Sequence, residues 1–161
     1  MRKHVTIWRI EGDQGRGPWH TLDNNDENVK YAACRYMHHT MGMDWDQIVR
    51  IDPSNHPAPS NEMRAFNTKW ASDKVYGVPN LSLLSVWFTP KFRKALAAVW
   101  PDGRLVRYRV PAEFAVIDRS QACFDKSMAH VVERRQINFE AHARQRKRIT
   151  QALTKVSLGV E

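Results

Sequence analysis

The sequence contains little cysteine and no long apolar run. Its two cysteines, Cys34 and Cys123, match neither a CxxC pair nor a metal-ligand spacing, so we expect reduced, half-buried thiols. No apolar run approaches the roughly 20 residues that a membrane helix needs. The residues after Met1 alternate and carry charge, unlike the apolar segment of a signal peptide. These absences predict a cytoplasmic protein with no membrane partner.

Common catalytic and metal-binding motifs are also missing. The chain contains no GxSxG, no Walker pattern and no HExxH, and its seven histidines are scattered, so we predict no metal site. Asp44 and Asp46 could bind a divalent ion, but a helix is expected to start directly after them, which favours a capping role. The sequence therefore favours a binding role over catalysis.

Three glycines within residues 12–17 follow a predicted strand, as they would in a phosphate-binding loop. In such a loop the helix begins immediately, so that its N-terminus meets the phosphate. Here Pro18 and Trp19 intervene, and we expect a structural turn instead.

The chain nevertheless contains enough apolar material for one folded unit. Hydrophobic residues make up 42% of it and charged residues 26%, with six Trp, six Phe and four Tyr, as in ordinary globular proteins. Alternation predicts strands at 5–10, 105–110, 114–117 and 121–124, and three- and four-residue spacing predicts helices at 29–37, 62–72, 80–88 and 91–99. We expect an α+β fold with a small mixed or antiparallel sheet, packed helices and a long basic C-terminal helix.

Positive charge is concentrated in the last fifth of the chain. The net charge is +8, and eight of the 25 Lys and Arg residues lie between Lys126 and Lys155, against Glu133 and Glu140. We therefore divide the chain into a core at 1–127 and a helical extension at 128–161. Six cations of the extension are candidates for contact with phosphate groups or with an acidic partner: Arg134, Arg135, Arg144, Arg146, Lys147 and Arg148. A row of arginines gives salt-sensitive, sequence-neutral affinity for nucleic acid.

The same extension also carries an apolar spacing. Ile149, Leu153 and Val156 recur at intervals that place them on one side of a helix. They could form the seam of a homo-oligomer, and this structural role remains an alternative to nucleic-acid or acidic host-protein binding.

Four motifs, taken in order, resemble a group of small phage and prophage proteins. They are Ile7-Trp8-Arg9-Ile10 followed by Gly15-Arg16-Gly17-Pro18-Trp19, the loop His56-Pro57-Ala58-Pro59, the segment from Gly77 to Trp87-Phe88 with its leucines, and Gln121-Ala122-Cys123-Phe124. The resemblance spans roughly residues 5–128. It implies an accessory protein, for host takeover or against host defence, working in the cytosol of a bacterial host.

The order of elements also resembles a reduced ADP-ribosyltransferase fold. Such enzymes place an arginine on the first strand, here Arg9, and a catalytic glutamate on a late strand. In this chain the late strand carries Gln121, which can hydrogen-bond a ribose but cannot hold negative charge. The resemblance implies NAD as the cofactor, with Arg9, His56 and Gln121 as site residues, either in a transferase or in a scaffold that only binds NAD.

Overall fold

The computed structural model describes residues 1–13, 15–18, 28–68 and 73–138. Its strands are β1 (His4–Glu11), β2 (Lys74–Gly77), β3 (Arg104–Pro111), β4 (Ala115–Ile117), β5 (Ala122–Asp125) and β6 (His130–Gln136). Its α-helices are α1 (Val29–His39), α2 (Trp45–Ile51), α3 (Asn61–Thr68), α4 (Leu81–Trp87) and α5 (Pro90–Val99). Short 3-10 turns at Pro53–Asn55, Ala112–Phe114 and Lys126–Met128 complete the described elements. The α+β expectation with antiparallel strands is confirmed.

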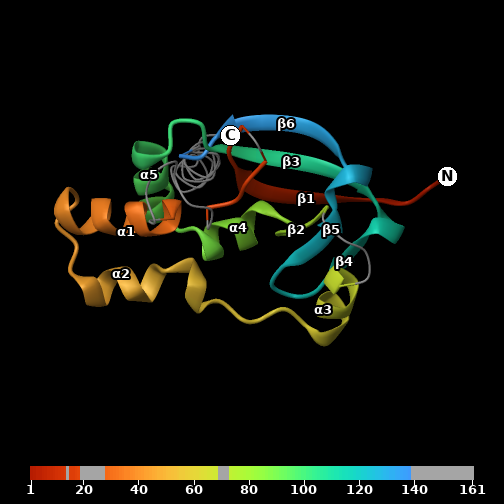
Figure 1. Cartoon of the computed structure of the whole chain (residues 1–161), viewed down its shortest axis with the longest axis horizontal. Helices are drawn as coiled ribbons and strands as arrows, with labels where there is room; N and C mark the ends of the chain where they lie inside the picture. Colours follow the sequence, from red (N-terminus) through yellow and green to blue (C-terminus); the bar gives the residue numbers. More distant parts are fainter. Residues whose placement is uncertain (14, 19–27, 69–72, 139–161) are drawn as a thin grey trace, which may run out of the picture.

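The strands form two three-stranded antiparallel sheets (Figure 1). The first sheet has the order β1-β3-β6 and the second the order β2-β5-β4. One pair of backbone hydrogen bonds, each 2.8 Å long, joins Trp8 on β1 to Val78 just after β2. The second sheet thus meets the first at its β1 edge, and this junction is where the candidate site lies.

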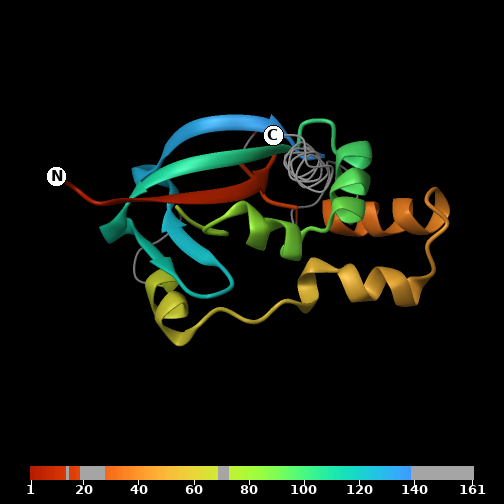
Figure 2. The ribbon, with the colours of Figure 1, turned by 180° about the vertical axis from the view of Figure 1, so that it is seen from behind.

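Alternation along β1 and β3 gives the first sheet two different sides. On the side that we call the sheet side, Ile7 and Tyr108 pack with Phe124 of the second sheet. On the opposite side, which we call the helix side, Ile10 and Leu105 pack with helices α1, α4 and α5. Figure 2 shows the second sheet and helix α4 below the first sheet, and helix α5 beside one end of it. Each side of this sheet therefore packs into its own hydrophobic cluster.

Side-chain caps fix where the helices begin. Asn28, Asn80 and Thr89 accept hydrogen bonds from the first turns of α1, α4 and α5. Asp44 and Gln47 form a reciprocal capping box at the start of α2, so the capping role expected for Asp44 is confirmed. The Asn80 cap starts α4 shortly after the end of β2, and Trp87 in its last turn lies at the sheet junction.

The structure corrects the start of the expected C-terminal helix. Residues 130–136 form β6, which pairs with β3. The expectation of a helix there was wrong because Val132 is an extra residue in the ladder: Glu133 pairs with Arg107 and Val131 with Tyr108. This bulge interrupts the alternation that would have indicated a strand. The remainder of the expected helix, 139–161, lies outside the described residues.

Candidate functional site

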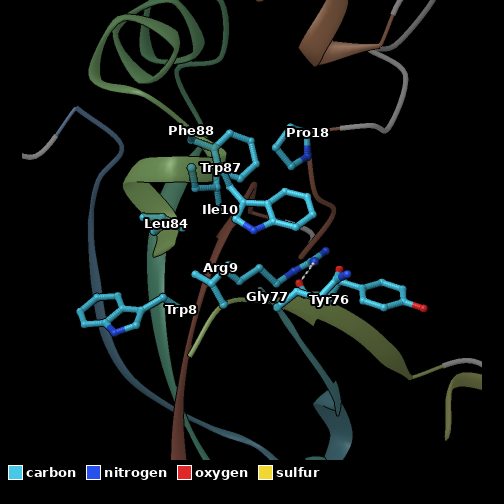
Figure 3. A pocket seen from close by; sticks show the side chains of 11 residues that line it. Trp8, Arg9, Ile10, Pro18, Tyr76, Gly77, Leu84, Trp87 and Phe88 are labelled. Carbon is cyan, nitrogen blue, oxygen red and sulfur yellow. Dashed lines mark hydrogen bonds between the residues drawn. The ribbon is translucent and has the colours of Figure 1, made fainter. Parts of the chain in front are cut away.

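A pocket opens beside β1 where the two sheets meet (Figure 3). It spans about 400 Å³, including the part open to solvent. Its lining comes from β1, β2, α4 and two loops: Trp8, Arg9, Ile10, Pro18, Tyr76, Gly77, Val78, Leu84, Trp87, Phe88 and Gln121. Most of these residues are apolar or aromatic, and Arg9 and Gln121 are the exceptions. Such a lining suits a ligand with a flat ring and a few polar groups.

Trp87 forms a firmly held wall of the pocket. Its indole Nε1 donates a 2.7 Å hydrogen bond to the Ser120 carbonyl. The ring of His56 stacks on it, with centroids 4.3 Å apart and 30° between the planes. Figure 3 shows the rings of Trp87 and Phe88 beside Pro18. Trp87 thus presents a fixed aromatic surface, because its polar edge and one side are already engaged.

Arg9 reaches from β1 toward Tyr76, as Figure 3 shows. Its Nη1 donates to the Tyr76 carbonyl at 2.6 Å, and its Nε donates to Glu11 Oε2 at 3.0 Å. A third, longer contact runs from Nη2 to the Gly15 carbonyl at 3.4 Å. The guanidinium is therefore oriented by β1, β2 and the glycine turn together.

Behind Arg9 lies a buried carboxylate, Glu11, whose side chain is 1% exposed. Lys126 Nζ lies 2.9 Å from Glu11 Oε2, and Arg134 Nη1 lies 3.8 Å from Oε1. The Tyr108 hydroxyl donates a hydrogen bond to Glu11 Oε1. Burial, followed by this bond to a carboxylate, raises the pKa of the Tyr108 phenol. We call these five residues the Glu11 cluster.

Gln121 is fixed by the loops around it. Its Nε2 donates to the Pro57 carbonyl at 3.2 Å, and Gln121 as a whole is only 4% exposed. Asp118 accepts hydrogen bonds from the backbone N–H groups of Ser120 and Gln121, at 2.8 and 2.9 Å. The amide therefore has one end tied to the His-Pro-x-Pro loop, while the residue lines the pocket.

The glycine turn lies against the cations of the site. Gly15 has a φ of +72°, which favours glycine, and an added Cβ would collide with the Lys126 ammonium. A Cβ on Gly17 would come within 3.1 Å of Arg9 Nη2. These glycines allow the turn to pack closely on the two cations.

Of the three residues expected for an NAD site, the structure places two in the pocket lining. Arg9 and Gln121 both line the pocket, and His56 lies behind Trp87. The six basic candidates are not brought together in the same way. Arg134 faces Glu11, and Arg135 pairs with Glu133 on β6. Arg144, Arg146, Lys147 and Arg148 lie outside the described residues, as do Ile149, Leu153 and Val156.

Sequence reasoning missed several contributors to this site, among them Tyr76, Trp87, Glu11 and Lys126. Glu11 carried a signal, because alternation places it on the same side of β1 as Ile7, and an inward glutamate needs a partner. Nothing local marked Lys126, since its contact with Glu11 joins residues far apart in the chain.

The described residues also bear on metal binding, membrane spanning and thiol reactivity. Within the described ranges, no group of three His, Cys, Asp or Glu side chains could hold a metal ion. No helix in the described part of the chain is long and apolar enough to cross a membrane. Burial raises the pKa of both Cys34 and Cys123 to about 11, so neither thiol is activated for nucleophilic attack.

Comparison with known proteins identifies the family. No curated protein and no solved structure matches the chain. The sequence profile of a family described as "Bacteriophage T4 Y00F protein" matches residues 1–138, which include every described strand and helix and the whole pocket. The expectation of a phage protein is thereby confirmed. The chain belongs to the bacteriophage T4 Y00F protein family.

Proposed function

We propose that this phage-family protein is an accessory protein that binds a nucleoside-containing small molecule in the pocket, with NAD as the candidate ligand. One observation carries the proposal: Arg9 and Gln121, which are far apart in the sequence, both line one pocket with aromatic walls. Arrangements of this kind, with apolar walls and a few convergent polar groups, are common in ligand sites.

The lining chemistry fits such a ligand. A planar base or nicotinamide ring would stack on Trp87, where base–aromatic stacking contributes about 1–3 kcal/mol. The Gln121 amide can hydrogen-bond a ribose hydroxyl or a carboxamide, and the Arg9 guanidinium can meet an anionic group. His56 supports the opposite side of the Trp87 ring rather than contacting the ligand.

The lining favours binding over group transfer. Cleavage of a glycosidic bond builds positive charge on the sugar, and enzymes stabilise that charge with a carboxylate. The lining residues that the structure describes include no aspartate or glutamate. Glu11 lies behind Arg9 and is already paired with cations. We therefore propose a binding protein rather than a transferase.

Thermal unfolding with and without NAD tests the proposal. A ligand at 100 times its dissociation constant adds about 2.7 kcal/mol to the stability of the folded state. For a chain of this size that corresponds to a rise of about 5–10 °C in Tm. The absence of any shift at millimolar NAD would reject NAD as the ligand.

A pair of tryptophan variants locates the site. Trp87→Leu should weaken NAD binding about tenfold, because it removes the stacking surface. Trp45→Leu serves as the control, since Trp45 lies on α2, is 47% exposed and does not line the pocket. For each variant, the Tm with NAD is compared with the Tm of the same variant without NAD. A change in the stability of the free protein therefore cancels. Equal shifts in both variants would place the ligand elsewhere.

A second candidate function is binding of nucleic acid through the basic C-terminal segment. Its support is the sequence alone: Arg144, Arg146, Lys147 and Arg148 form a dense basic run in a chain of net charge +8. Anisotropy titration of labelled duplex DNA and RNA at several salt concentrations tests it. The logarithm of the association constant should fall with the logarithm of the salt concentration, with a slope near −0.9 for each phosphate contact. Absence of binding at low salt would leave an acidic host protein as the partner.

A further inference from the structure

We propose that the Glu11 cluster is the phosphate subsite of the pocket, so that the ligand is a nucleotide rather than a nucleoside. This inference rests on the proposed function, since it names the group that the bound molecule must carry. The observation behind it is an excess of positive charge beside the pocket: among the residues that the structure describes, one carboxylate faces three cations.

The charges can be counted from the contacts. Arg9, Lys126 and Arg134 all lie within 4 Å of the Glu11 carboxylate. One negative charge offsets one of these cations, which leaves two. The Tyr108 hydroxyl also donates to Glu11, so a neutral donor stabilises the carboxylate in addition to the three cations.

Arg9 connects this excess to the pocket. It lines the pocket and also bonds Glu11. Lys126 adjoins it, because the ammonium and the guanidinium share both Glu11 Oε2 and the Gly15 carbonyl as acceptors. An anionic group placed against Arg9 therefore lies next to a second cation.

The weakest of these contacts mark where a phosphate would bind. Both contacts to the Gly15 carbonyl are long, 3.4 Å from Arg9 Nη2 and 3.3 Å from Lys126 Nζ. A phosphate oxygen bonds such donors more strongly than a neutral carbonyl does, because both partners are then charged. We infer that phosphate takes over these donors, while Glu11 keeps Arg9 in place through its 3.0 Å bond to Nε.

Arg134 contributes in a different way. Its side chain is 51% exposed and its ion-pair contact with Glu11 is 3.8 Å, so it acts on the pocket through its field. At the edge of a protein such a charge is partly screened by salt. We therefore expect that removing the Arg134 charge weakens phosphate binding less than removing the Lys126 charge does.

The test compares nucleotides with their nucleosides on the full chain. Four probes represent the two halves of NAD: AMP and adenosine, nicotinamide mononucleotide and nicotinamide riboside. We expect each nucleotide to bind about tenfold or more tightly than its nucleoside. Lys126→Met should lower that preference about threefold to fivefold and Arg134→Gln about twofold.

Two matched control variants each remove one positive charge at a residue that does not line the pocket. Lys94→Met on α5 and Arg50→Gln on α2 remove exposed cations and should leave the preference unaltered. Equal affinity for nucleotide and nucleoside would overturn the phosphate subsite and leave the proposed function standing. A nucleotide preference that survives both Lys126→Met and Arg134→Gln would likewise overturn it. If NAD and all four probes fail to bind, both proposals are wrong.

Discussion

Each side of the first sheet carries one glutamate that pairs with arginines, and the two glutamates differ in their surroundings. On the sheet side, Glu11 is 1% exposed and accepts from Arg9 and Lys126 at 3.0 and 2.9 Å. On the helix side, Glu133 is 26% exposed and pairs with Arg107 and Arg135. The same residue types thus form one buried network and one partly hydrated network on a single sheet.

The two networks differ in what surrounds the cations. Arg107 and Arg135 lie over the Trp8 ring, 5.5 and 5.4 Å from its centroid, so they have an aromatic partner as well as a carboxylate. The Arg107 Nε lies 3.3 Å from Glu133 Oε2 without hydrogen-bond alignment. In the Glu11 cluster, by contrast, the carboxylate is the shared acceptor of every member. Loss of Glu11 should therefore cost far more than loss of Glu133.

The largest effect is expected for Glu11→Gln. Removing one partner of a buried ion pair leaves an uncompensated charge and typically costs about 3–5 kcal/mol. Here Arg9 would keep its contact with the Tyr76 carbonyl but lose its carboxylate. Urea unfolding of the variant measures the cost, and NAD binding should fall with it because Arg9 is no longer oriented.

A variant of the neighbouring phenol shows whether this cost belongs to the buried charge. Tyr108→Phe leaves Glu11 and all three cations in place and removes one hydrogen bond. If Glu11→Gln cost no more than Tyr108→Phe, the buried carboxylate would contribute only as a hydrogen-bond acceptor. That outcome would show that the buried charge of Glu11 does not distinguish its network from the network of Glu133.

An intermediate effect is expected for Tyr108→Phe itself. A hydrogen bond to a charged acceptor contributes about 1.5–3 kcal/mol, and the ring keeps its packing against Phe124, with centroids 5.2 Å apart. The pH dependence provides a second measurement. Because the pKa of Tyr108 is raised in the folded state, its contribution is complete below about pH 10 and is lost as pH rises through the higher folded value.

Unfolding free energies of wild type and Tyr108→Phe should therefore converge above pH 10. Cys34 and Cys123, whose pKa values are also raised, lower the stability of both proteins equally at alkaline pH. A difference that stayed constant up to pH 12 would show that the phenol does not exchange its proton on unfolding in this range.

Much of the fold could be predicted from local patterns. The strand at 104–111 alternates from Val106 to Val110, with Val106, Tyr108 and Val110 on one side. The helix after Pro90 was also predictable, because proline suits the first turn and Thr89 provides the cap. In each case the residues that determine the element lie within it.

The parts that were missed depend on contacts between distant segments. β2 is only four residues long and half-buried throughout, so no periodicity marks it. Gly77 has its reason only in three dimensions: an added Cβ would lie 2.7 Å from both Ile7 Cγ2 and the Trp8 carbonyl. The same holds for the pocket. Arg9 and Gln121 were named from a resemblance, whereas the wall formed by Tyr76 and Trp87 depends on how two sheets meet.

The smallest effect is expected for Glu133→Gln. Partly exposed ion pairs contribute about 0–1 kcal/mol because water and salt screen them, and Arg107 and Arg135 would keep their contact with Trp8. The hydrogen bond from Arg135 lowers the pKa of Glu133 below its ordinary value of 4.5. Since the folded pKa is the lower one, the contribution is present above pH 4.5 and is lost as pH falls through the folded value. Urea unfolding at pH 7 and pH 3 should give a small difference from wild type at pH 7 and almost none at pH 3. A cost at pH 7 as large as that of Glu11→Gln would show that burial does not separate the two carboxylates.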